Sequence, residues 1–173
     1  MDLFTELNFL EYNLFMRRKQ AVQRAVKPDL KLGSTEVTKT INLIMIGGNK
    51  ATAEKIFYDA LTKAAKKENI GELELFQKII NTLKPEKITS TRRVGASTYN
   101  IPKTISEKQK LSKAIKFLIN AARKLAWNDG KKISDALAII MEQTFHGTGS
   151  AMQELKTLSN IVNDNEAFSY LRF

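Results

Sequence analysis

The 173-residue sequence contains no cysteine and only one histidine, His146. The absence of cysteine excludes disulfide bonds, zinc–cysteine sites and thiol catalysis, although it does not fix the cellular compartment. A single histidine cannot form a familiar histidine-rich metal site, and no serine lies in a nucleophile elbow. His146 begins the glycine-rich break HGTGS, where we expect a solvent-exposed or helix-capping residue. We therefore predict no catalytic residue, no metal ligand and no cofactor, and hence no enzyme.

Long apolar runs are also absent, because no stretch approaches the ~18 residues of a transmembrane helix. Three acids precede the first base, Arg17, which is unlike the basic start of a signal peptide or an acid-poor transit peptide. We expect no membrane partner, and either synthesis at the site of action or a targeting signal that is removed or atypical. Leucines at helical spacing predict an amphipathic helix over residues 1–16.

Acidic residues are few relative to basic ones, with 18 Asp and Glu against 28 Lys and Arg, a net charge of +10. Such an excess favours a polyanionic partner, either nucleic acid or an anionic membrane surface. The alternative is a merely basic soluble protein. The clustering argues against it, since residues 17–33 hold six bases and one acid, and residues 84–116 hold nine bases and two acids. Residues 142–173, by contrast, are slightly acidic.

Arginine is scarce beside lysine, at 7 against 21 residues, and isoleucine and asparagine are frequent. This bias is typical of an AT-rich gene and suggests an organellar or bacterial origin.

Apolar residues at helical spacing predict six core helices joined by short connections. Ser34 is the expected N-cap of the first helix, and Ser106 with Gln109 has the pattern of a capping box. The predicted fold is mainly α, a six-helix bundle with an inserted two-stranded β-ribbon arm. We predict an N-terminal extension and basic arm over 1–33 and a single helical domain over 34–173, with the hairpin at about 86–105. The expected helices are 34–46, 52–67, 72–83, 106–126, 133–145 and 151–163.

Residues 17–33 form an irregular basic arm in this interpretation, because Pro28 and Gly33 interrupt its second half. Such arms often fold on nucleic acid, and the alternative is a solvated linker. Lys50 follows two glycines and precedes a helix. It lacks the spacing of a P-loop, but it could meet a phosphate at a helix N-terminus.

The stretch TSTRRVGASTYNIP, residues 89–102, reads as the hairpin. Because neighbouring strand residues face opposite sides, Arg92 and Arg93 place one guanidinium on each face. Neither face is apolar enough to lie on a core, so the ribbon is expected to project as an arm that depends on a partner for order. Gly95 permits the turn, Tyr99 offers a stacking ring, and Pro102 is expected to end the pairing. A solvated loop is the alternative.

The motif RRVGASTYNIP closely resembles the hairpin of the universal small-subunit ribosomal protein family numbered seven. Four further segments resemble this family in the same order, so the resemblance covers about residues 17–173. They are PDLKLGS (28–34), NKATAEKIFYDAL (49–61), INAARK (119–124) and EAFSYLRF (166–173).

The resemblance implies a structural, primary rRNA-binding protein that nucleates assembly of the small-subunit head. It implies partners in the 3′ major domain of the rRNA and in neighbouring head proteins, with the hairpin near E-site tRNA and mRNA. Residues 1–16 exceed the usual bacterial N-terminus, and AMQELK (151–156) stands where members often carry a basic run. The extension and the composition resemble those of an organellar member of the family. A mitochondrial location is therefore expected, and the plastid or the bacterial cytoplasm is the alternative.

Phosphate neutralisation by lysine and arginine would supply the affinity, and RNA shape the recognition. The alternative is a helical DNA-binding regulator, which would prefer particular duplex sequences. An RNA-processing enzyme has no candidate residue. The residues predicted to bind RNA are Arg17, Arg18, Lys19, Arg24, Lys27, Lys31, Lys50, Arg92, Arg93, Tyr99, Lys113, Lys116, Arg123 and Lys124.

Overall fold

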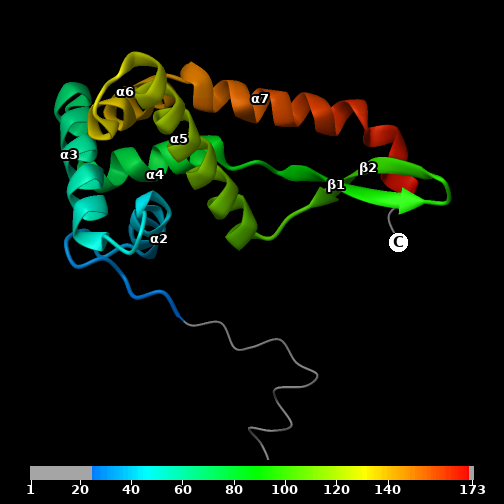
Figure 1. Cartoon of the computed structure of the whole chain (residues 1–173), viewed down its shortest axis with the longest axis horizontal. Coiled ribbons are helices and arrows are strands. Elements are labelled where there is room, and N and C mark those ends of the chain that lie inside the picture. The colour runs from blue at the N-terminus through cyan, green and yellow to red at the C-terminus, as the bar shows by residue number, and fades with distance from the viewer. Residues whose placement is uncertain (1–24, 172–173) are drawn as a thin grey trace, which may run out of the picture.

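The structure is a computed structural model that describes residues 25–171 and the side chains of residues 25–170. The amphipathic helix predicted for residues 1–16 lies outside this range. Within it, six α-helices and one two-stranded antiparallel sheet confirm the predicted fold class (Figure 1). The elements are α2 (Thr35–Ile44), α3 (Lys50–Glu68), α4 (Glu72–Leu83), β1 (Lys87–Val94), β2 (Ser97–Thr104), α5 (Glu107–Asp129), α6 (Ile133–Phe145), α7 (Gly149–Asp164) and the 3₁₀ helix η1 (Glu166–Leu171).

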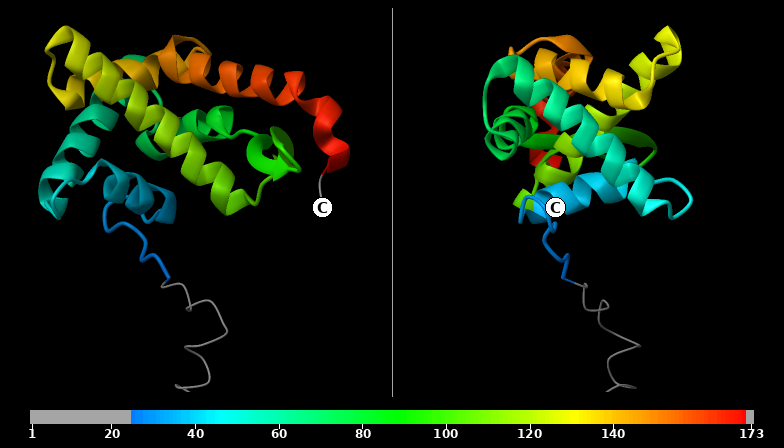
Figure 2. Two further views of the ribbon diagram at one scale, coloured as in Figure 1. Left: turned by 45° about the vertical axis from the view of Figure 1, so that its right-hand side comes forward. Right: turned by 90° about the vertical axis from the view of Figure 1, so that its left-hand side faces the viewer.

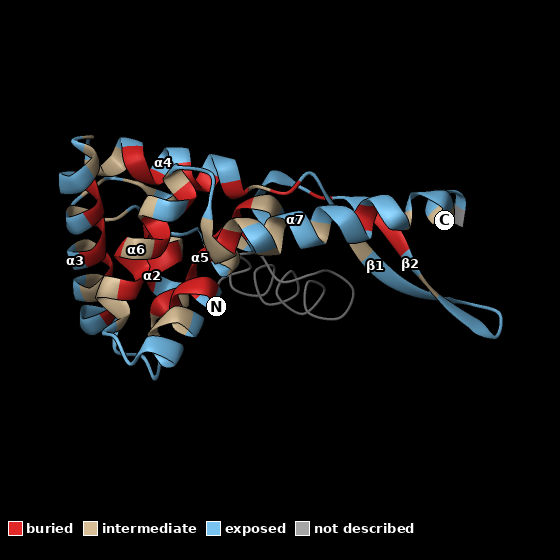
Figure 3. Cartoon of the chain, turned by 90° about the horizontal axis from the view of Figure 1, so that it is seen from above, coloured by how far each residue is buried: buried red, intermediate tan, exposed pale blue. Residues whose placement is uncertain are grey.

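Helix α6 is the central element of the bundle and contacts α3, α4, α5 and α7. Its sequence ISDALAIIMEQTF is apolar around most of its circumference, as expected for a helix with neighbours on several sides. The buried residues lie on the sides of the surrounding helices that face it (Figure 3). None of the helices within residues 25–171 is long and apolar enough to cross a membrane.

Among the six described helices, a side-chain N-cap hydrogen bond is present only at α2. Ser34 caps α2 as predicted, since its Oγ accepts a hydrogen bond from the Glu36 amide at 3.3 Å. The capping box predicted for α5 is wrong. Ser106 occupies the N-cap position without a side-chain hydrogen bond, and its carbonyl accepts from the Gln109 amide at 2.8 Å instead. The first turn of α5 is therefore held by backbone hydrogen bonds, without a side-chain cap.

The hairpin pairs Lys87 with Thr104 at its base and Val94 with Ser97 at its tip. Gly95, at φ +64°, takes the first position of the two-residue loop, where a tight hairpin turn requires a positive φ. The prediction that Pro102 ends the pairing is wrong, because Pro102 pairs with Thr89 and the ladder continues. Every strand of a two-stranded ribbon is an edge strand, so the missing N–H of proline can face away from the partner.

We expect Phe57→Ala to destabilise the bundle severely. Phe57 is fully buried, and its ring packs edge-on against Phe76 with centroids 5.5 Å apart. The cavity and lost contacts should lower the free energy of unfolding by about 3–5 kcal/mol, measured by urea denaturation. Ile46→Ala, at a residue 73% exposed, is the control and should change it by less than about 0.5 kcal/mol. Equal effects of the two changes would contradict this description of the core.

Candidate nucleic-acid interface

The residues predicted to bind RNA fall into three separate groups on the structure. Lys27, Lys31 and Lys50 surround the entry to the bundle, and Arg92, Arg93 and Tyr99 lie on the hairpin. The third group, on α5, comprises Lys113, Lys116, Arg123 and Lys124. Arg17, Arg18, Lys19 and Arg24 lie outside the described residues.

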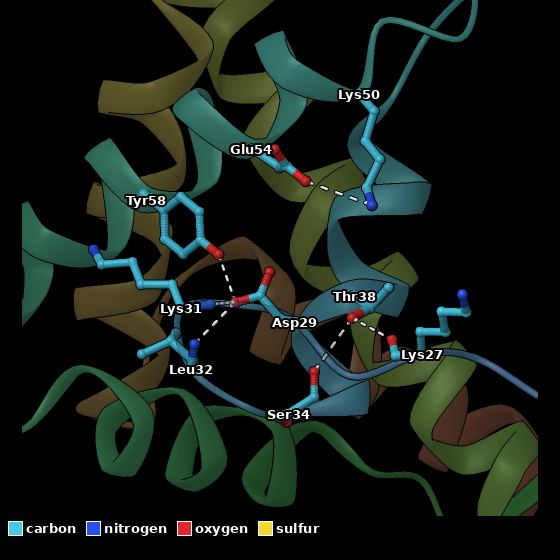
Figure 4. Close-up of polar contacts among 9 residues, drawn as sticks. All are labelled: Lys27, Asp29, Lys31, Leu32, Ser34, Thr38, Lys50, Glu54 and Tyr58. Carbon is cyan, nitrogen blue, oxygen red and sulfur yellow. Dashed lines mark hydrogen bonds and ion pairs between the residues drawn. The ribbon is translucent and has the colours of Figure 1, made fainter.

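Asp29 fixes the segment that leads into α2 (Figure 4). One carboxylate oxygen, Oδ2, accepts hydrogen bonds from the backbone amides of Lys31 and Leu32, both at 3.0 Å. The same oxygen accepts a hydrogen bond from the hydroxyl of Tyr58, on α3, at 2.5 Å. Further along, the Thr38 hydroxyl donates to the Lys27 carbonyl at 2.9 Å. Residues 27–32 are thus irregular, as predicted, but they are held to two helices.

Burial raises the pKa of Asp29, but hydrogen bonds from Tyr58 and from the Leu32 and Lys31 amides outweigh it, so the pKa lies below its ordinary value of 3.8. The positive charge of Lys50 acts in the same direction. Burial, followed by the bond to Asp29, raises the pKa of Tyr58 well above its ordinary value. Tyr58 therefore stays a protonated donor and Asp29 a charged acceptor at neutral pH.

Three lysines of this region line one groove of about 250 Å³ together with Asp29, Glu54 and Tyr58. Lys50 lies 3.5 Å from Glu54, and Lys31 lies 3.5 Å from Glu72 with its ammonium 4.5 Å from the Tyr58 ring centroid. Lys27 is exposed and carries no such acidic partner among the described residues. Of the three lysines, Lys27 is therefore the one whose charge is least neutralised by the described residues.

We expect Tyr58→Phe to loosen this attachment, because the variant removes one donor to a charged carboxylate. The free energy of unfolding should fall by roughly 1–2 kcal/mol at pH 7. Since the pKa of folded Asp29 is depressed, its contribution is present above the ordinary carboxyl pKa and is lost as the pH falls through the folded value. The difference between wild type and variant should therefore shrink in acid.

The matched control is Tyr170→Phe, because Tyr170 is 72% exposed. Its unfolding free energy, measured by urea denaturation across the same pH range, should follow that of the wild type. A Tyr58→Phe effect that stays constant down to acid pH would argue against the role assigned to Asp29.

Helix α5 presents one cationic face. Lys113 and Lys116 are exposed, and with Asn120, Arg123 and Trp127 they follow the spacing of one helix face. The buried residues of α5, from Leu111 to Ala122, occupy the opposite side. The only acids of the helix, Glu107 and Asp129, stand at its two ends, where each pairs with a lysine. The exposed face is therefore free of negative charge along its length.

Two of the predicted residues on α5 also have contacts inside the protein. Arg123 donates from Nη2 to the Leu43 carbonyl at 3.1 Å and so satisfies a carbonyl at the C-terminal end of α2. Lys124 forms an ion pair with Glu154 on α7. Substitution of either residue would change helix packing as well as surface charge, so Lys113 and Lys116 are the better residues for testing RNA contact.

The hairpin is not bare along its whole length, and this corrects the expectation that neither face lies on a core. Its stem contacts α7 and η1, and Ile101 is 4% exposed. The Tyr99 ring lies 5.2 Å from the Phe168 ring, and Lys87 pairs with Glu166 at 3.0 Å. The tip is exposed throughout, whereas β2 carries a buried stretch near its base (Figure 3). The C-terminal segment therefore supports the stem and leaves the tip accessible.

The arginines lie on the accessible tip, while Tyr99 lies where tip and stem meet. Arg92 pairs across the ribbon with Tyr99, and Arg93 with Thr98; Arg93 also donates to the Gly95 carbonyl at 3.3 Å. Tyr99 is half-buried against Phe168, which leaves only part of the ring for another contact. Sequence reasoning missed this partner because Phe168 is 69 positions away and belongs to no regular pattern.

We expect Phe168→Ala to loosen the hairpin and leave the bundle intact, because the change removes the ring that covers Tyr99. Amide hydrogen exchange in β1 and β2 should become faster, and exchange in α3 and α6 should stay unchanged. Phe168→Leu, which keeps an apolar side chain at this position, is the control and should have a smaller effect. Unaltered exchange in the hairpin of the Ala variant would contradict the support by η1.

His146 lies at the C-cap of α6, as predicted, with its Nε2 3.0 Å from Glu68 Oε1. Within residues 25–171, no group of three or more His, Asp or Glu side chains is placed to hold a metal ion.

A helical bundle with three cationic surfaces, one of them on a β-ribbon, is typical of proteins that bind folded nucleic acid. Residues 16–163 match the family described as ribosomal protein S7p/S5e. The chain is 36% identical over 158 residues to small ribosomal subunit protein uS7 of Kosmotoga olearia, which covers 91% of this chain and 100% of the relative. It is 37% identical to the uS7 protein of Laribacter hongkongensis over the same share of this chain and 99% of the relative. The chain belongs to the ribosomal protein S7p/S5e family.

Proposed function

We propose that this protein is a structural constituent of the small ribosomal subunit that binds the 3′ major domain of its rRNA and nucleates assembly of the head. The match along residues 16–163 carries this proposal. The cationic surfaces support it, because each can neutralise phosphates without reading a base sequence. The alternative, a DNA-binding regulator, has no comparable support. Membership in a family of ribosomal proteins also supports a non-enzymatic role.

The three groups act in different ways in this proposal. The basic arm, residues 17–33, and Lys50 beside its attachment contact rRNA phosphates next to α2 and α3. The α5 face contacts a second stretch of the rRNA. Asp29 and Tyr58 do not touch RNA; they position Lys27 and Lys31 relative to Lys50. Neighbouring head proteins contact the remaining surface, including α7, which carries one base, Lys156, against Glu154 and Asp164.

The hairpin tip, in the same proposal, reaches toward E-site tRNA and mRNA. Its two arginines face opposite sides of the ribbon, so one tip can contact RNA on both sides. Support of the stem by η1 favours this role, because it reduces the freedom that the tip loses on binding. Tyr99 contributes chiefly through its packing on Phe168.

We further propose that the ribosome concerned is mitochondrial, on the grounds of the lysine-rich composition and the fifteen residues that precede the family match. The relatives named above are bacterial, so a bacterial ribosome is the alternative. Cell fractionation with an antibody against the protein distinguishes the two. The signal should be found with mitochondrial ribosomes, and a signal with cytoplasmic ribosomes would favour the alternative.

Co-sedimentation at high salt tests the central proposal. A protein held by six phosphate contacts alone loses about a thousandfold in affinity between ~50 and ~200 mM salt. An integral constituent is held by many contacts and neighbours, and should stay with the small subunit after such a wash. Complete release into the supernatant would count against it.

Arg92→Ala combined with Arg93→Ala should weaken RNA contact at the tip and leave the fold intact, because both side chains are exposed. The slope of log affinity against log salt should fall by up to about 1.4, at ~0.7 per phosphate contact of single-stranded RNA. Lys55→Ala with Lys66→Ala, two exposed positions on α3, is the charge-matched control. Unchanged salt dependence, subunit assembly and translation in the arginine variant would remove the tip from the interface.

A further inference from the structure

Trp127 is the only tryptophan of the chain and is 89% exposed. It lies in the last turn of α5, at the point where the helix and the following loop project from the bundle (Figure 2). An indole ring is a large apolar surface with a polar edge, and such rings are usually covered in part. The residue has no role in the core and lies outside the sets of residues predicted to bind RNA.

The ring continues the cationic face of α5. Lys113, Lys116, Asn120, Arg123 and Trp127 are separated by three, four, three and four positions, which places them along one face over about 21 Å at ~1.5 Å per residue. Beyond the ring, Lys132 is exposed and starts the next helix. The order of groups along this face of α5 is therefore cation, cation, amide, cation, aromatic ring.

We infer that Trp127 stacks on an unpaired base of an RNA strand whose phosphates lie along Lys113 and Lys116. This inference rests on the proposed function and names a contact within it. Proteins that bind single-stranded RNA combine a cationic track with aromatic rings on which bases stack. Sequence-specific readout is not required, since every base has a π-face.

A protein partner is the less favoured occupant. Binding hot spots at protein interfaces lie in packed, desolvated pockets surrounded by further contacts. The residues that follow Trp127, from Asn128 to Lys132, are exposed and are polar or glycine, so they offer no apolar surround. A lone ring at the end of a cationic face fits a base better than it fits an apolar pocket.

The single tryptophan makes the inference directly measurable, because stacking on a nucleobase quenches indole emission. The full chain is titrated with a transcript of the 3′ major domain of the small-subunit rRNA, and separately with inorganic polyphosphate. Polyphosphate occupies the same cations but has no base. We expect quenching by the transcript and little change with polyphosphate. Binding of the transcript without quenching would overturn the inference.

Two variants complete the test. Trp127→Ala should bind the transcript at least about fivefold more weakly, as for loss of one stacked base, whereas Trp127→Phe keeps a ring and should stay close to wild type. Both should fold normally, since the side chain is exposed. Equal affinity of the Ala variant and the wild type would overturn the inference.

The same measurements distinguish a failure of this inference from a failure of the proposed function. If Lys113→Gln with Lys116→Gln weakens binding but Trp127→Ala does not, RNA binding by α5 stands and the stacking contact is wrong. If the wild type does not bind the transcript at all, the proposed function fails and the inference fails with it. A blue shift of Trp127 emission with head proteins, without quenching by RNA, would assign the ring to a protein partner.

Discussion

The packing of α6 inside the other helices is the interaction on which the rest of the structure depends. Its small and apolar residues, from Ala136 to Met141, let α3, α4, α5 and α7 approach the same axis. Burial of these surfaces supplies the main driving force, at roughly 25 cal/mol per Å² of apolar area. Because these helices share one core around α6, the cationic surfaces on α3 and α5 are fixed relative to one another.

Several cations on this protein are held in place by neutral and acidic groups of the chain itself. Asp29 is the clearest case, because one carboxylate oxygen orders the two amides that follow it and joins them to α3 through Tyr58. Glu166 acts in a similar way on the stem of the hairpin through Lys87. Ordering these segments before binding reduces the conformational entropy lost when RNA is bound.

The hairpin has a stabilised stem and an accessible tip, a combination that an isolated two-stranded ribbon lacks. An isolated ribbon is marginally stable, and a tip that must be accessible cannot be buried. In this structure the stem provides the stability and the tip provides the accessible surface. Packing of Tyr99 and Ile101 near η1 stabilises the stem, while Arg92 and Arg93 stay in solvent at the tip. The C-terminal segment thus forms one structural unit with the hairpin.

Most of the secondary structure could be predicted from the sequence, because helical spacing, the Ser34 cap and the Gly95 turn are local signals. The charge clusters were equally visible, since the positions of the charged residues can be read directly from the sequence. The sequence did not show that Asp29 meets Tyr58, that Arg123 caps α2, or that Phe168 covers Tyr99, because these partners are 29, 80 and 69 positions apart. Only tertiary packing brings such residues together, and it decides which polar groups are used inside the protein and which are left for RNA.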